Sequence, residues 1–173
     1  MLAYVFSHRP AKGVGVAAYE ESLRRFHRLL AEARPRGLLD SATYRVAGAY
    51  EDWYRIESSA ALEVLNDAAV RGRQGHAHDD AARMTADGSG KLYSLAAGAL
   101  SSDAGFEVRF SKPAGTSYLD LYARLRQWTE LPGVSLWRRM MVLGPPPEFC
   151  LIASSAPQFP AETRPEVLRR ELI

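Results

Sequence analysis

The histidines and carboxylates of one short segment are the first residues whose spacing could do chemistry. In HAHDDAARM, His76 and Asp80 are four residues apart, so on a helix they would share one face. Two ligands do not make a metal site, because a bound zinc takes at least three protein ligands. Asp79 and Asp80 are also the acids that a helix dipole favours in a first turn. The sequence therefore predicts exposed polar side chains here and no metal site.

The two remaining histidines stand apart from one another. His8 comes at the end of a predicted strand, where we expect a solvated residue, and His27 lies between Phe26 and Leu29 as a partly exposed side chain of a predicted helix. An axial haem ligand would have to face a pocket, and neither position meets that requirement. The sequence predicts no haem and no other cofactor.

Candidate nucleophiles and phosphate loops are also present, each with a simpler structural explanation. Cys150 lies in the apolar stretch FCLI and is typical of a buried core thiol. The pairs Ser58-Ser59 and Ser154-Ser155 lack the G-x-S-x-G context of a nucleophile and favour a role as helix caps. KGVGV, Lys12 to Val16, contains G-x-G but lacks the third glycine of a dinucleotide loop.

Length and composition restrict the class of protein. A chain of 173 residues with 47% hydrophobic and 24% charged residues has the balance of a globular protein. The formal net charge of +2 gives no argument for nucleic acid, and the single cysteine excludes an intramolecular disulfide framework. No apolar run approaches the roughly 18 residues of a membrane span, and MLAYVFSHRP does not resemble a secretory signal. We expect a cytoplasmic protein that binds neither nucleic acid nor membrane.

The elements that must position any site occur twice along the chain. Residues 37–60 align without a gap on residues 133–156, and seven of the 24 positions are identical, including the shared ending I-x-S-S-A. Upstream, VFSHRPAKG echoes VRFSKPAG in the same order. Two colinear blocks are not explained by chance matches in a chain rich in Ala, Gly and Ser. The sequence therefore predicts an internal duplication.

Each copy contains the same run of predicted elements. A short alternating strand is followed by a helix whose apolar residues recur at helical spacing, then by a hairpin, and then by a second helix that begins after the paired serines. The first helix should end near Ala33, the hairpin turns are expected at Gly48 and at Gly144 to Pro147, DGSG is a predicted turn and KLYSLAAG a fourth strand. In the second copy prolines interrupt the second helix, TRPEVLRREL resumes it, and no clear final strand follows.

This element order, β-α-β-β-α-β, is that of ferredoxin-like units. With its duplication the chain resembles the dimeric α+β barrel superfamily, which includes antibiotic-biosynthesis monooxygenase-like, EthD-like and NIPSNAP-like proteins and the haem-binding chlorite dismutases. The resemblance implies an α+β fold in which two fused ferredoxin-like units with antiparallel sheets form an α+β barrel. The units would be residues 1–98 and 106–173 with a linker at 99–105, folding as one cooperative domain. The chain would be a monomer with an internal pseudo-dimer, or a homodimer.

Strand alternation predicts which side chains such sheets turn away from the helices. The helix-facing rows are expected to hold Leu2, Tyr4, Phe6, Ala42, Tyr44, Val46, Tyr54, Ile56, Phe106, Val108, Phe110, Met140, Val142, Cys150 and Ile152. The opposite rows then hold Thr43, Met141, Phe149 and the predicted ligand-binding set, which consists of Arg45, Trp53, Arg55, Glu107, Arg109, Trp137 and Arg139.

The opposite rows mix aromatic rings with cations, as a pocket for a small hydrophobic or acidic ligand would. Two alternatives remain open: a solvated sheet edge, or a buried ion pair of Glu107 with Arg109 or Arg139 that orders the sheet. We expect a small-molecule-binding protein or a cofactor-independent oxygenase-like enzyme whose pocket lies between the two sheets. The alternative is a non-catalytic interaction or structural domain.

Overall fold

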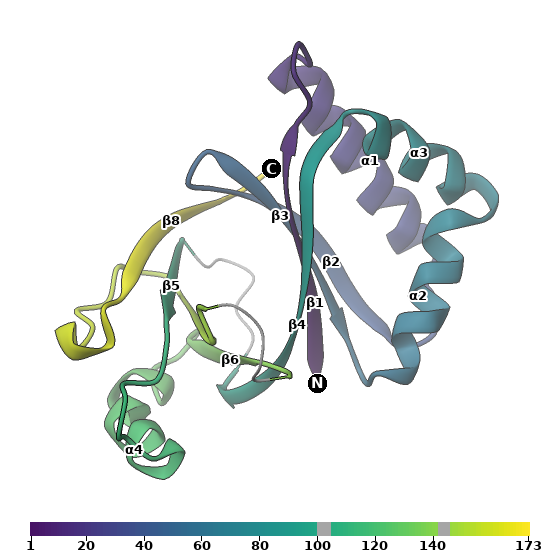
Figure 1. Ribbon diagram of the computed structural model, residues 1–173. Coiled ribbons are helices and arrows are strands. Elements are labelled where there is room, and N and C mark those ends of the chain that lie inside the picture. Colours follow the sequence, from purple (N-terminus) through teal and green to yellow (C-terminus); the bar gives the residue numbers. More distant parts are fainter. Residues whose placement is uncertain (100–104, 142–145) are drawn as a thin grey trace. The chain divides into compact units, whose positions relative to one another are not determined.

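The chain forms two compact units in the computed structural model (Figure 1). The structure describes residues 1–99, 105–141 and 146–173. Unit 1 comprises Met1–Leu92 with Glu171–Ile173, and unit 2 comprises Tyr93–Arg170. Residues 100–104 of the predicted linker at 99–105, and residues 144 and 145 of the predicted turn at Gly144 to Pro147, lie outside the described residues.

Unit 1 is an antiparallel sheet with helices on one face (Figure 1). Its first helix buries Tyr19, Leu23, Phe26 and Leu30, which recur at helical spacing. The helix ends where the left-handed Arg34 donates its backbone N–H to the Leu30 carbonyl. The elements of unit 1 are β1 (Leu2–Pro10), α1 (Val16–Ala33), β2 (Leu38–Val46), β3 (Ala49–Ile56), α2 (Ala60–Val70), α3 (Gly72–Arg83) and β4 (Thr85–Gly98), which continues into unit 2.

The strand register decides which residues of unit 1 face the helices. Thr43 on β2 pairs with Asp52 on β3, and Ala42 pairs with Trp53. Directly paired residues share a face, so Thr43 lies on the helix side with Asp52. The predicted helix-facing row Ala42, Tyr44 and Val46 is therefore wrong, because the register of the Gly48 hairpin shifts β2 by one residue relative to β3. The rows predicted for β1 and β3 are correct.

The DGSG segment is part of a strand, and the predicted turn is wrong. It lies inside the 14-residue β4. Its glycines allow close approach to aromatic rings of β1, since a Cβ on Gly88 would lie 2.5 Å from Phe6 Cζ and one on Gly90 would lie 2.5 Å from the Tyr4 hydroxyl. A glycine-rich stretch whose composition is typical of a turn is here a strand, and its missing side chains leave space for the aromatic rings of β1.

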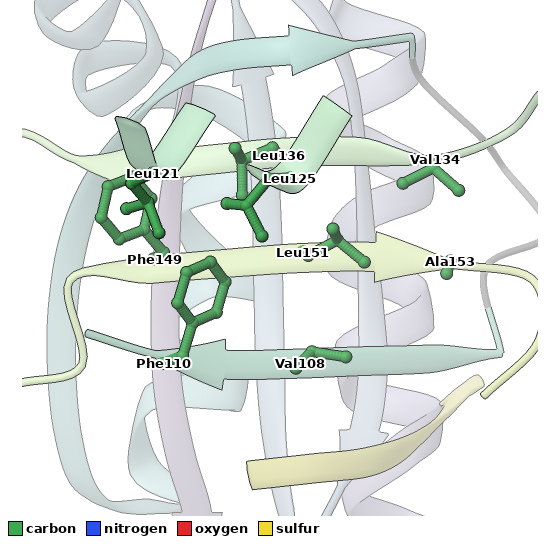
Figure 2. Packing of buried hydrophobic residues seen from close by; sticks show 9 residues of the cluster. All are labelled: Val108, Phe110, Leu121, Leu125, Val134, Leu136, Phe149, Leu151 and Ala153. Atoms are coloured by element: carbon green, nitrogen blue, oxygen red, sulfur yellow. The ribbon is translucent and has the colours of Figure 1, made fainter. Parts of the chain in front are cut away.

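Unit 2 is a second antiparallel sheet covered by one helix. Figure 2 shows its core, in which Leu121 and Leu125 of the helix meet side chains of three strands. The core strand residues are Val108, Phe110, Leu136, Phe149, Leu151 and Ala153. The elements are β5 (Phe106–Phe110), α4 (Tyr118–Thr129), β6 (Ser135–Arg139), β7 (Phe149–Ala153), the short 3-10 helix η1 (Ala161–Thr163) and β8 (Glu166–Leu172).

Two expectations for unit 2 need correction. Phe149 lies in the helix-covered core, whereas Cys150 and Ile152 point to the opposite face, because the residues of β7 alternate one position out of the predicted phase. The segment EVLRREL is β8 and not a resumed helix. It pairs with β5, and Arg170 donates its backbone N–H to the Gly105 carbonyl, so sheet pairing overrides the helix preference of Glu, Leu and Arg.

The strand order confirms the predicted fold class. In unit 1 β3 pairs with β1 and with β2, and in unit 2 β5 pairs with β8 and β7 while β6 pairs with β7 and β4, all of them antiparallel. The protein is thus an α+β protein with antiparallel sheets. Within the described part of the chain, no helix is both long and apolar enough to cross a membrane.

Candidate functional site

Two adjoining cavities lie between the helices and the sheet of unit 1. They have volumes of about 360 and 240 Å³ and share Phe6, Phe26, Tyr54 and His78 as lining residues. The larger cavity falls within the ~300–1,000 Å³ typical of small-molecule sites. It is lined mainly by carbon atoms of Tyr4, Phe6, Phe26, Tyr54, Leu62 and Leu65. The smaller cavity adds the polar side chains of Asp52 and Thr85.

Asp52 is a buried carboxylate that two histidines share. His8 Nε2 is 3.2 Å from Asp52 Oδ2, and His27 Nε2 is 3.2 Å from Oδ1. Both are close contacts of an imidazole nitrogen with a carboxylate oxygen that fall outside hydrogen-bond geometry. The Thr43 hydroxyl donates to Oδ1 at 2.5 Å, and the Tyr54 hydroxyl lies 3.4 Å from Oδ2. Four strand and helix side chains therefore hold this carboxylate at the wall of the smaller cavity.

The other ring nitrogens of the two histidines contact hydroxyl groups. His8 Nδ1 is 2.5 Å from the Tyr19 hydroxyl, which in turn is 3.0 Å from Thr85 Oγ1. His27 Nδ1 is 2.9 Å from Ser41 Oγ. All four ring nitrogens of His8 and His27 thus face a polar partner.

Asp52 is the ionised carboxylate of this cluster. Burial by itself raises the pKa of the Asp52 carboxyl, but His27 and then His8 outweigh it, and the pKa lies well below its ordinary value. Burial, with the Asp52 charge, raises the pKa of Tyr54 well above its ordinary value. Burial raises the pKa of Tyr19 to about 12. At neutral pH the cluster contains an ionised Asp52 among tyrosines that keep their protons.

Sequence reasoning missed this cluster. His8 was expected to be solvated and His27 partly exposed, yet both are buried, with 2% and 8% of their surface exposed. The signal was available in β1, where His8 continues the helix-facing alternation of Tyr4 and Phe6. It was weaker for Asp52, because a carboxylate between Tyr50 and Tyr54 on a strand is more often exposed.

The predicted ligand-binding residues of unit 1 separate onto two faces. Arg45 lies on the helix side, where it pairs with Glu20 of α1 and, at 2.8 Å, with Glu171. This ion pair ties β2 to α1, so Arg45 is not grouped with Trp53 as predicted. Trp53 and Arg55 lie on the opposite face, where Arg55 pairs with the carboxylate of Asp40.

The predicted residues of unit 2 share one face of its sheet. Trp137 pairs across strands with Cys150, and Arg109 also pairs with Cys150, which places both opposite the α4 core. Glu107 and Arg139 alternate onto the same face. The buried Glu107 accepts a 2.5 Å hydrogen bond from Arg109 Nε, as in the ion-pair alternative. Their role in ligand binding remains a prediction.

His76 and Asp79 of α3 are exposed as predicted, whereas His78 is only partly exposed and lines both cavities, so the prediction is wrong for His78. Asp80 pairs with Arg25 and Arg83, and His78 Nδ1 lies 3.4 Å from Asp79. Among the residues that the structure describes, no group of three or more potential ligands could hold a metal ion. Ser59 precedes α2 without capping it through its side chain, and Cys150 is buried.

Comparison with solved structures places the fold among known proteins. No family model matches the chain, and no curated protein matches its sequence. An anthrone oxidase-like protein is similar at TM-score 0.61 and 12% identity, over 99% of this chain and 91% of that one. A protein provisionally named a chlorite dismutase gives TM-score 0.58 at 13% identity, over 99% and 94%. One from Lactobacillus acidophilus, provisionally named a monooxygenase, gives 0.57 at 7% identity, over 99% and 93%. At these identities the likeness shows the fold.

The two buried histidines do not fit the haem of chlorite dismutases. A haem iron needs an imidazole nitrogen directed at the open face of a pocket. In His8 and in His27 one nitrogen contacts Asp52 and the other contacts a hydroxyl group. Neither His8 nor His27 is therefore available as an axial ligand of a haem.

Proposed function

We propose that unit 1 binds a small, neutral aromatic molecule in the cavity between its helices and its sheet, and that the protein is an oxygenase-like enzyme acting on that molecule. The observation that carries the proposal is an apolar, aromatic-lined cavity of about 360 Å³ that adjoins a buried ionised carboxylate. Aromatic walls favour a ring, and Asp52 supplies the polar group that orients it. The oxidase-like and monooxygenase-like names of the structural neighbours support the reaction class.

The negative charge of Asp52 restricts the class of ligand more than the sequence alone does. A carboxylate ligand near Asp52 would meet a like charge in a poorly solvated site, where repulsion at ~4 Å is of order 4 kcal/mol. A ligand hydroxyl would instead donate to Asp52 or Thr85. The predicted preference for an acidic ligand is therefore replaced, for this cavity, by a preference for a neutral one.

Ligand binding is tested with 2-naphthol and 2-naphthoate, which share the ring system and differ in charge. We expect 2-naphthol to raise the melting temperature and to bind at least about tenfold more tightly in calorimetry, because a bound ligand stabilises the folded state. Ala69→Phe adds a ring to the cavity wall and should weaken binding at least about tenfold. Ala31→Phe adds the same ring to the exposed side of α1 and should leave affinity unchanged.

Oxygenase-like activity is tested by O2 uptake with anthrone. Anthrone loses a methylene proton, and the resulting anion reacts with O2 to give anthraquinone and one water per O2 consumed. We expect Ala69→Phe to abolish uptake and Ala31→Phe to retain it. Binding without O2 uptake by anthrone would leave a small-molecule-binding protein, whereas equal binding of 2-naphthol by wild type and Ala69→Phe would favour the interaction-domain alternative.

A further inference from the structure

A line of hydroxyl and imidazole groups runs from the smaller cavity into the interior of unit 1. Thr85, the first residue of β4, lines that cavity, and its Oγ1 is 3.0 Å from the Tyr19 hydroxyl. This hydroxyl is 2.5 Å from His8 Nδ1, and His8 Nε2 is 3.2 Å from Asp52. The steps from Thr85 to Tyr19 and from Tyr19 to His8 are within hydrogen-bond reach, as proton transfer requires.

We propose that Thr85, Tyr19 and His8 form a proton relay that takes the acidic proton of a ligand in the cavity to the His8 imidazole. The proposal rests on the proposed function, because it needs a ligand whose acidic proton reaches Thr85. The ligand O–H bond breaks as Thr85 Oγ1 receives the proton. Thr85 passes its own proton to Tyr19, and Tyr19 passes its proton to His8 Nδ1. The products are a ligand anion and an imidazolium, and no electrons are transferred.

The surroundings of Tyr19 and His8 give the relay its direction. Tyr19 is fully buried, so a lasting phenolate there is costly, and the proton it loses to His8 is replaced from Thr85. Ionised Asp52 stabilises positive charge on His8, while the Thr43 hydroxyl holds the carboxylate in place. Thr85 donates to the Ala81 carbonyl at 2.8 Å and must turn from it to Tyr19 as it accepts the ligand proton.

The roles of the three residues differ. Thr85 contacts the ligand and is the catalytic residue at the cavity. Tyr19 carries the proton from Thr85 to His8. His8 is the acceptor, and Asp52 and Thr43 are positioning residues that act through it.

The tautomer of His8 tests the relay without any ligand. A relay ending at Nδ1 requires that Nδ1 accept the Tyr19 hydrogen bond, so neutral His8 must carry its proton on Nε2, beside Asp52. Long-range 1H–15N NMR spectra of the full chain distinguish the two tautomers. We expect the Nε2–H form. Finding neutral His8 with its proton on Nδ1 would overturn the relay, whatever the cavity binds.

The second test follows the proton with 2-naphthol, whose excited state is a strong acid. In the wild-type complex we expect emission from the naphtholate. Tyr19→Phe removes one hydroxyl of the relay and should lower the naphtholate fraction at least about tenfold, with affinity changed less than about twofold. Thr85→Val, which keeps the side-chain volume, should do the same. Tyr50→Phe is the matched control, because the Tyr50 hydroxyl donates to Glu20 at 2.9 Å and lies outside the relay.

The possible outcomes distinguish the relay proposal from the ligand-binding proposal. Unchanged naphtholate emission in folded Tyr19→Phe and Thr85→Val complexes would refute the relay while the binding proposal stands. An equal loss in Tyr50→Phe would also refute it, because the effect would then be general to buried hydroxyls. Failure of wild type to bind 2-naphthol would count against the proposed function, and the His8 tautomer alone would then decide the relay.

Discussion

Replacing Asp52 with asparagine tests the buried carboxylate on which the candidate site depends. The change keeps the side-chain volume and removes the charge that His8 and His27 contact at 3.2 Å. The Thr43 and Tyr54 hydroxyls also donate to this carboxylate. Hydrogen bonds to a charged group are worth about 1.5–3 kcal/mol each, and the neutral bonds that asparagine can form are worth about 1 kcal/mol each. The net loss is about 2 kcal/mol. For a chain of this size we expect the melting temperature to fall by about 4–8 °C.

The pH dependence gives the same prediction a second measurement. The pKa of Asp52 is lower in the folded chain than its ordinary value of 3.8. A lowered pKa contributes stability that is fully present above the unfolded value and is lost as pH falls. The difference in free energy of unfolding between wild type and Asp52→Asn should therefore be constant near neutral pH. It should shrink by up to about 1.4 kcal/mol per pH unit below 3.8.

The control is a half-exposed carboxylate that pairs with an exposed arginine. Asp67 pairs with Arg71 one helical turn away at 3.4 Å, and about half of its side chain is exposed. Asp67→Asn should change stability by less than about 0.5 kcal/mol. Urea unfolding at pH 7 and at pH 3 measures all three proteins. The reasoning fails if Asp52→Asn matches Asp67→Asn at pH 7, or if its deficit does not shrink in acid.

Two further substitutions test the packing that frames the site and the second core. Gly88→Ala should destabilise the chain by about 1–3 kcal/mol, because its Cβ would lie 2.5 Å from the Phe6 ring. The control is Gly15→Ala, which should cost less stability because a Cβ there meets no atom within 4 Å. Equal losses of stability in urea unfolding would contradict the close approach of Gly88 to Phe6. Leu121→Ala should cost about 2–5 kcal/mol, whereas Leu119→Ala, at a residue 79% exposed, should cost less than about 0.5 kcal/mol. Similar melting temperatures for the two leucine variants would contradict the core in Figure 2.

The sequence by itself determined the elements whose signals are local. The spacing of Tyr19, Leu23 and Phe26 predicts α1, and the Gly48 break predicts the hairpin that follows it. Their order was enough for the fold class, because a ferredoxin-like unit is recognised from the sequence of strands and helices. Such signals lie within one turn or one strand, where a side chain's neighbours in sequence are its neighbours in space.

Tertiary structure alone decided β8, the register of β2 and the site. EVLRREL has the composition of a helix, and only pairing with β5 makes it a strand. The faces of β2 depend on which residue opposes Asp52, and a shift of one residue reverses them. His8, His27 and Asp52 are far apart in sequence, and each alone reads as a surface residue. They form a site because the sheet and α1 bury them against one another, where a buried charge is costly unless polar groups surround it.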